Sequence, residues 1–112
     1  MKHFISFLSD GRIQIGEILF DERRKTLTYR EIEHYCSKQV FMLLSAFIHA
    51  DEYFLSNSEI MNVCGWSSTD IGLNENRRTA VKYLRKQLRT VETHICIEYI
   101  PVREGYQLFV VS

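Results

Sequence analysis

The spacing of the hydrophobic residues changes twice along this chain of 112 residues, and these changes limit the folds that it can adopt. Between Arg12 and Cys36 the hydrophobic residues stand in short runs rich in β-branched and aromatic side chains, which predicts strands. Between Ser37 and Val91 they recur every three or four residues, which predicts helices. After Ile95 two β-rich runs follow. The sequence therefore predicts an α+β fold.

Four short strands are expected before the first helix. They cover residues 13–15, 18–20, 26–29 and 32–35, and a further strand is expected within 4–8. The charged run from Asp21 to Lys25 is expected to form a hairpin tip. Short alternating runs joined by polar turns favour a small antiparallel sheet.

Two helices are expected after this sheet. The first begins after Ser37, whose hydroxyl can accept a hydrogen bond from a free N–H group of the first turn. Its buried face is expected to contain Val40, Phe41, Leu43, Leu44, Phe47 and Ile48. The second helix is short: it begins at Ser56, where Glu59 completes a capping box, and it ends before Gly65.

The third helix is expected to separate its apolar and basic residues onto two faces. A loop is predicted over residues 66–73, and Asn74 or Asn76 is expected to be the N-cap. The apolar arc contains Ala80, Val81, Leu84, Leu88 and Val91. Six basic residues and no acidic residue lie between positions 77 and 89: Arg77, Arg78, Lys82, Arg85, Lys86 and Arg89. The chain has 14 basic and 14 acidic residues in total, but a local basic surface can bind phosphate on a neutral molecule.

The C-terminal runs at 95–100 and 106–111 flank a turn at Pro101–Gly105 and predict a hairpin. An N-terminal antiparallel sheet, three helices and a C-terminal β-hairpin wing form the element order of a winged helix-turn-helix. A basic helix fits the major groove of B-DNA, and a neighbouring hairpin can reach the adjacent backbone or minor groove. We therefore expect a single domain over residues 1–112 that binds double-stranded DNA in a sequence-specific manner.

Several motifs also resemble the DNA-binding domains of OmpR/PhoB-type transcription regulators, and within them the ToxR and CadC-like regulators. These motifs are Ile15-Gly16-Glu17, the run Ser37–Leu44, Leu55-Ser56, Ile60-Met61, Trp66, Leu84-Arg85-Lys86-Gln87-Leu88 and Gly105-Tyr106-Gln107-Leu108. Three features depart from the pattern: Val40 replaces a usual Glu, Trp66 stands one place late, and the wing holds one extra residue before Gly105.

The resemblance implies a bacterial transcription regulator, of a kind found in two-component systems, that binds DNA as two copies on repeated half-sites. Such a domain would be cytoplasmic, or would form the cytoplasmic part of a longer membrane-anchored regulator. The loop that corresponds to Ser67–Asn74 contacts RNA polymerase in some relatives, so here it either contacts the polymerase or only connects two helices.

The DNA contacts are expected from the third helix and the wing. Five side chains of the helix are predicted to point toward the groove: Arg78, Thr79, Lys82, Tyr83 and Lys86. Arg85 and Arg89 are expected nearer to phosphate, while Arg77 lies on the apolar side and either contacts DNA or folds back to solvent. Arg103 at the hairpin tip is expected to enter the minor groove, or else it is an exposed turn residue. Tyr106 is expected in the core.

No metal, cofactor or enzymatic activity is expected. The four histidines and three cysteines share no ligand spacing, and the cysteines are too scattered for a disulfide framework, so reduced, buried thiols are expected. The acidic pairs Glu31/Glu33 and Asp51/Glu52 are accompanied by no nucleophile motif and no phosphate loop. No apolar run approaches the roughly 18 residues of a membrane-spanning helix, which predicts a soluble domain.

One alternative function stays open at this point. The domain can instead be a winged-helix protein-interaction module that does not bind DNA. The neutral net charge and the position of Glu104 beside Arg103 in the wing are both compatible with that alternative.

Overall fold

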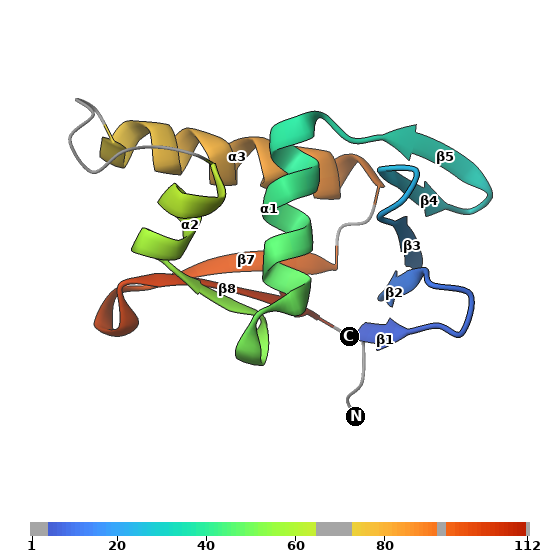
Figure 1. Ribbon diagram of the computed structural model, residues 1–112, viewed down its shortest axis with the longest axis horizontal. Coiled ribbons are helices and arrows are strands. Elements are labelled where there is room, and N and C mark those ends of the chain that lie inside the picture. Colours follow the sequence, from blue (N-terminus) through green and yellow to red (C-terminus); the bar gives the residue numbers. More distant parts are fainter. Residues whose placement is uncertain (1–4, 65–72, 92–93, 112) are drawn as a thin grey trace.

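The structure is a computed structural model that describes residues 5–64, 73–91 and 94–111, and over residues 73–77 it describes the backbone alone. The described residues form a five-stranded N-terminal sheet, three helices and a three-stranded C-terminal sheet. Figure 1 shows α1 standing in front of α3 and the C-terminal sheet, with the N-terminal sheet to one side. The α+β fold expected from the sequence is confirmed.

The N-terminal sheet is an antiparallel meander in which each strand pairs with the next one along the chain. Its strands are β1 (Ile5–Phe7), β2 (Ile13–Ile15), β3 (Ile18–Asp21), β4 (Thr26–Tyr29) and β5 (Ile32–Tyr35). The five predicted strands are thus confirmed, including the one expected within 4–8. The register places Ile13 opposite Phe20 and Phe20 opposite Leu27, so one face of the sheet is apolar and buried.

Helix α1 (Lys38–His49) packs against this sheet and forms the centre of the core. As predicted, the Ser37 hydroxyl caps it by accepting a hydrogen bond from the Val40 N–H at 3.3 Å. Five of the six predicted core residues of α1 are buried, but Phe41 is only partly buried. Its ring lies at the sheet side, 5.9 Å from the Phe20 ring and 5.3 Å from the Lys25 ammonium, so it is close to solvent.

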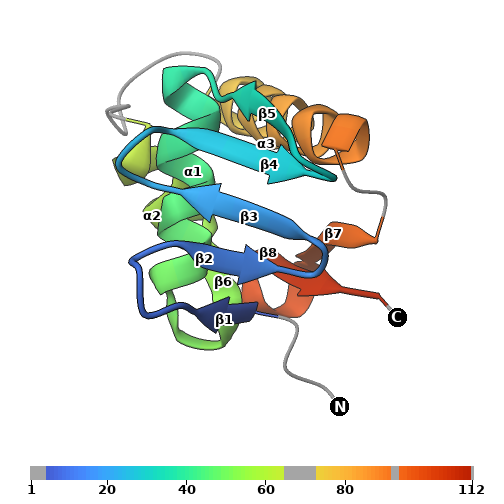
Figure 2. The same ribbon diagram turned by 90° about the vertical axis from the view of Figure 1, so that its right-hand side faces the viewer.

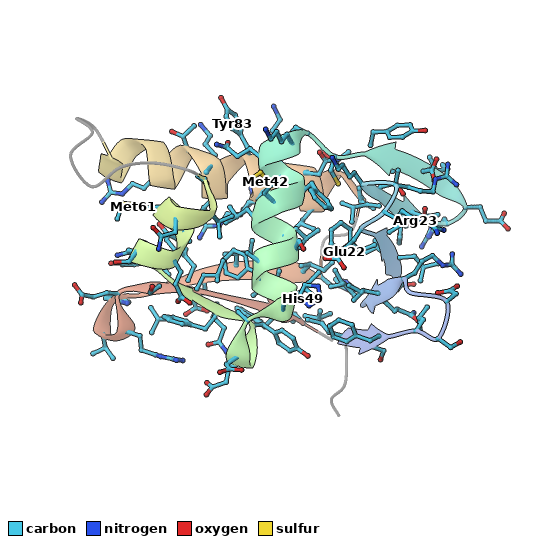
Figure 3. The ribbon with its side chains drawn as sticks, viewed as in Figure 1. Glu22, Arg23, Met42, His49, Met61 and Tyr83 are labelled. Carbon is cyan, nitrogen blue, oxygen red and sulfur yellow. The ribbon has the colours of Figure 1, made fainter. Side chains whose placement is uncertain are left out.

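A polar contact joins the turn between β3 and β4 to the last two turns of α1. The Glu22 carboxylate accepts a hydrogen bond from the Ser45 hydroxyl, and its Oε2 lies 2.9 Å from His49 Nε2. Figure 3 shows Glu22 and His49 on these two elements. The contact fixes the sheet against α1, and the Phe7 ring of β1 adds to it, 5.6 Å from the His49 ring.

Two short elements that the sequence did not predict connect α1 to α2. They are η1 (Asp51–Tyr53), a 3₁₀ turn, and β6 (Phe54–Ser56). Helix α2 (Asn57–Val63) follows with the predicted capping box: Glu59 N–H donates to the Ser56 hydroxyl at 3.1 Å, and Ser56 N–H donates to the Glu59 carboxylate at 2.8 Å. The expected stop at Gly65 lies outside the described residues.

Helix α3 (Leu73–Val91) begins earlier than the sequence indicated. Leu73 was expected in the loop and Asn74 or Asn76 at the N-cap, but all three lie inside the helix. Asn is tolerated there because the N–H groups of a first turn have no acceptor within the helix, so a capping residue type fixes the boundary only approximately. The rest of the predicted loop lies outside the described residues.

The C-terminal sheet has the strand order β6-β8-β7, with β7 (Ile95–Ile100) and β8 (Gly105–Val110) forming the wing hairpin around η2 (Pro101–Arg103). The hairpin is confirmed, but Gly105 belongs to β8 and pairs with Ile100, and Val111 lies beyond the strand. The turn is therefore one residue shorter than predicted. A Cβ at Gly105 would lie 2.4 Å from the Leu55 carbonyl oxygen, so only glycine lets β8 approach β6 this closely.

Candidate nucleic-acid interface

Helix α3 has one buried face and one exposed face, and the division follows the predicted one. The apolar arc of Ala80, Val81, Leu84, Leu88 and Val91 is buried in the common core. The exposed residues among its described side chains are Arg78, Thr79, Lys82, Tyr83, Lys86, Arg89 and Thr90. Tyr83 is 52% exposed and points away from the core in Figure 3. The five residues predicted to face the groove are thus on the surface. Arg77 was predicted on the apolar side, and its side chain lies outside the described part of the structure.

The exposed cations of α3 are Arg78, Lys82, Lys86 and Arg89, and we call them the cationic face. Elsewhere in the molecule some arginines are paired with acids: Arg12 lies 2.7 Å from Asp10, and Arg24 lies 3.0 Å from Glu33. No residue of the cationic face forms an ion pair with any other residue that the structure describes. Its positive charge is therefore not compensated by neighbouring carboxylates within the described residues.

Arg85 differs from the cationic face because the protein itself holds its guanidinium. Its Nε and Nη2 donate hydrogen bonds to the Ile97 carbonyl oxygen at 3.0 and 2.7 Å, and the guanidinium carbon lies 5.8 Å from the centre of the Tyr106 ring. Ile97 belongs to β7, the strand at the edge of its sheet, and Tyr106 to β8. Arg85 therefore joins α3 to both strands of the wing, a role that the sequence did not indicate.

Part of the cationic face lies near the strand β7 of the wing, because Lys82, Lys86 and Arg89 line one hollow with Arg85, whose guanidinium reaches the Ile97 carbonyl. Figure 2 shows α3, β7 and β8 on one side and the turn between β3 and β4 on the opposite side. The shallow, open hollow beside α3 is lined by Lys82, Arg85, Lys86, Arg89 and Thr90. Four of these five residues carry a positive charge, so the hollow attracts anionic groups.

The wing presents its only arginine in an unexpected way. The Arg103 guanidinium carbon lies 3.9 Å from the centre of the Phe54 ring, and its Nη1 lies 3.5 Å from the Glu52 carboxylate. The outermost side chain of the turn is Val102, which is 93% exposed. Neither sequence expectation, a free minor-groove side chain or a solvated turn residue, included this contact with the η1–β6 segment. Tyr106 is buried, as expected.

The cysteines are free thiols in partly buried positions, not the fully buried ones that the sequence suggested. Burial raises the pKa of the Cys36 thiol to about 11, and it also raises the pKa of Cys64. Both thiols therefore stay protonated and weakly nucleophilic at neutral pH. Within the described residues no group of three or more His, Cys, Asp or Glu side chains is placed to hold a metal ion.

Two further expectations from the sequence concern a possible polymerase contact and membrane-spanning helices. The segment Ser67–Asn74, considered for a polymerase contact, has no described side chains and lies almost wholly outside the described residues. Across the described part of the chain, no helix is long and apolar enough to span a membrane.

Comparisons with known proteins found similarity at the level of structure. No protein-family model matches the sequence, and no curated protein matches it either. Among solved structures, the DNA-binding domain of Escherichia coli CadC is similar, with a TM-score of 0.68 and 24% sequence identity. The match covers 84% of this chain and 87% of the CadC domain. Together with the sheet, three helices and C-terminal hairpin, this similarity shows that the chain has the fold of a winged helix.

Proposed function

We propose that this chain binds double-stranded DNA in a sequence-specific manner and thereby regulates transcription. Helix α3 would enter the major groove, and the wing would contact the flanking backbone or minor groove. The observation that carries the proposal is the cationic face, which is exposed near Arg85 and the strand β7 and forms no ion pair with described residues. The similarity to a solved DNA-binding domain supports it.

The spacing of the side chains on α3 suits a helix that lies in a groove. Arg78, Lys82 and Lys86 follow one another at intervals of four residues, so they form one row along the exposed face. Arginine and lysine donate to the O6 and N7 atoms of guanine, or to phosphate oxygens. Thr79 and Tyr83 lie beside this row and can donate a hydrogen bond or contact a thymine methyl group.

Arg85 and Arg89 contribute under this proposal through the DNA backbone. A guanidinium has about five N–H donors, and Arg85 directs two of its N–H groups to the Ile97 carbonyl, so the remaining donors are available to a phosphate. Arg89 lies one turn further along α3 and is exposed. We propose Arg85 and Arg89 as phosphate contacts, and two copies of the domain on repeated half-sites.

The first test is the salt dependence of binding to mixed-sequence duplex DNA, measured by fluorescence anisotropy. If the cationic face makes four phosphate contacts, affinity should fall roughly 150-fold between about 50 and about 200 mM salt. Lys82→Ala should weaken binding and lower the salt slope by about one unit. The matched control is Arg23→Ala, which removes one positive charge from the exposed turn between β3 and β4, on the opposite side of the molecule.

The results separate DNA binding from the alternative function. Equal effects of Lys82→Ala and Arg23→Ala would show that DNA does not contact α3. Absence of salt-dependent binding by the unmodified protein would favour a protein-interaction module. Selection of bound sequences from a random DNA pool then tests sequence specificity: an enriched motif supports it, and an unbiased pool contradicts it.

A further inference from the structure

The contact that holds Arg103 involves two residues from a distant part of the chain. Glu52 and Phe54 lie in the η1–β6 segment, and Arg103 lies 51 residues after Glu52. The guanidinium stacks on the Phe54 ring, while Nη1 faces the Glu52 carboxylate at 3.5 Å. Phe54 itself is fixed because its ring occupies the space beside Gly105, where an added Cβ would lie 2.4 Å from Phe54 Cζ. The arginine of the wing thus rests on a rigid aromatic surface.

The backbone of Glu52 has an unusual conformation that brings its carboxylate to this place. Glu52 has a φ of 56° and Tyr53 a φ of 57°, in the left-handed region that residues with a Cβ adopt rarely. Two hydrogen bonds hold the segment: the Gln107 side chain donates to the Glu52 carbonyl at 3.1 Å, and Tyr53 N–H donates to the Ala50 carbonyl at 3.1 Å. Because unfavourable backbone conformations persist only where their surroundings impose them, this position of Glu52 is determined by the fold.

The pairing of Arg103 with Glu52 changes the net charge that an approaching DNA backbone would meet at the wing. The Glu52 carboxylate compensates the charge of Arg103, whereas the cations of α3 have no such partner among the described residues. Both members of the pair are exposed to solvent, Arg103 by 42% and Glu52 by 70% of the side chain. An exposed pair of this kind is weak and can be broken by a competing phosphate.

We propose that Glu52 is a positioning residue that restrains Arg103 on the Phe54 ring and so limits the contribution of the wing to DNA binding. This inference rests on the proposed function. In the free protein Glu52 and Phe54 hold Arg103 against the η1–β6 segment, beside the turn end of the wing. In the complex a DNA phosphate or a minor groove competes with Glu52 for the guanidinium.

The test is a set of variants whose DNA affinity and salt slope are measured together. Glu52→Gln removes the carboxylate charge and keeps the side-chain length, and it should raise affinity about twofold to fivefold. The salt slope should become steeper by up to about one unit, because Arg103 then engages a phosphate fully. In the Arg103→Ala background the same substitution should have no comparable effect.

The matched control is Glu104→Gln. Glu104 is exposed in the same hairpin turn, and its carboxylate makes no contact with Arg103 in the described structure. If Glu104→Gln raises affinity as much as Glu52→Gln, or if Glu52→Gln acts equally with and without Arg103, the gain is a general charge effect and the proposal is wrong.

A measurement without DNA separates this inference from the proposed function. The Phe54 ring should shift the NMR signals of the Arg103 side-chain protons, and Glu52→Gln should reduce those shifts. Unchanged shifts in Glu52→Gln would overturn the positioning role even if the protein binds DNA. Reduced shifts together with no DNA binding by any variant would keep the restraint of Arg103 and reject DNA as the ligand.

Discussion

Helix α3 and the wing both carry basic residues, but they present them differently. The cations of α3 extend into solvent without acidic partners among the described residues. The arginine of the wing lies against an aromatic ring and a carboxylate from another segment. A basic residue in the sequence therefore shows only that a charge exists, and the fold decides whether that charge is available to a ligand.

The difference arises from the two kinds of secondary structure. In a helix, residues three or four positions apart share a face, and the run from 77 to 89 contains no acid, so Lys82, Arg85 and Lys86 have no acidic neighbour at these spacings within α3. In a hairpin the neighbours come from other strands. Here the pairing of β6 with β8 brings Glu52 and Phe54 beside the wing.

A large expected loss of stability tests the boundary between the two faces of α3. Leu84→Ala should lower the free energy of unfolding by about 2 to 5 kcal/mol, because a fully buried leucine leaves a cavity. Thr79→Ala, on the exposed face, should change it by less than about 0.5 kcal/mol. Chemical denaturation measures both. Similar losses in the two variants would show that the faces are wrongly assigned.

The same method distinguishes a fully buried aromatic residue from a partly buried one. Phe47→Ala should cost about 3 to 5 kcal/mol, whereas Phe41→Ala should cost clearly less, because the Phe41 ring remains partly exposed. Equal costs would mean that Phe41 is as deeply buried as the sequence suggested.

A smaller effect is expected where α3 meets the wing. Arg85→Lys keeps the charge but loses the forked hydrogen bonds to Ile97, so it should lower the free energy of unfolding by about 1 to 3 kcal/mol. Lys82→Arg, an exchange of the same two residue types on the exposed face, should leave stability unchanged. If Arg85→Lys is as stable as the unmodified protein, Arg85 does not join α3 to the wing.

A single cation of α3 should affect DNA binding without affecting stability. Lys86→Ala should reduce affinity by up to about tenfold and lower the salt slope by about one unit, because it removes one phosphate or base contact. Its denaturation midpoint should match that of the unmodified protein, since the side chain is exposed. A loss of affinity with an unchanged salt slope would indicate that Lys86 contacts no phosphate.

Local patterns in the sequence predicted most of the fold. The strands, the Ser37 cap and the Ser56 capping box depend on residues close together in the chain, and all of them are confirmed. The η1 and β6 elements were missed because each is only three residues long, too short for a period to appear, and because Glu52 and Tyr53 adopt left-handed conformations that their residue types do not suggest.

The candidate site was predicted less completely, for a related reason. Helical periodicity alone identifies which residues of α3 are exposed, and the structure agrees for the residues from 78 onward. The contacts of Arg85 and Arg103 depend on long-range pairing: one reaches a backbone carbonyl of β7 and the other reaches residues before α2. A single sequence contains no local signal for either contact.

The smallest expected effect concerns the wing alone. Arg103→Ala should reduce affinity less than about threefold, because Glu52 already compensates most of the charge that the substitution removes. Any preference for A·T-rich flanks should decrease only slightly, although such flanks offer a narrower and more negative minor groove to a free arginine. Competition among duplexes that differ only outside the half-sites measures this preference.

In the Glu52→Gln background, where Arg103 is released, the same substitution should reduce both affinity and flank preference more strongly. A tenfold or larger loss on Arg103→Ala in the otherwise unmodified protein would mean that the wing arginine is as available to DNA as the cations of α3, and the contrast between helix and wing would then be incorrect.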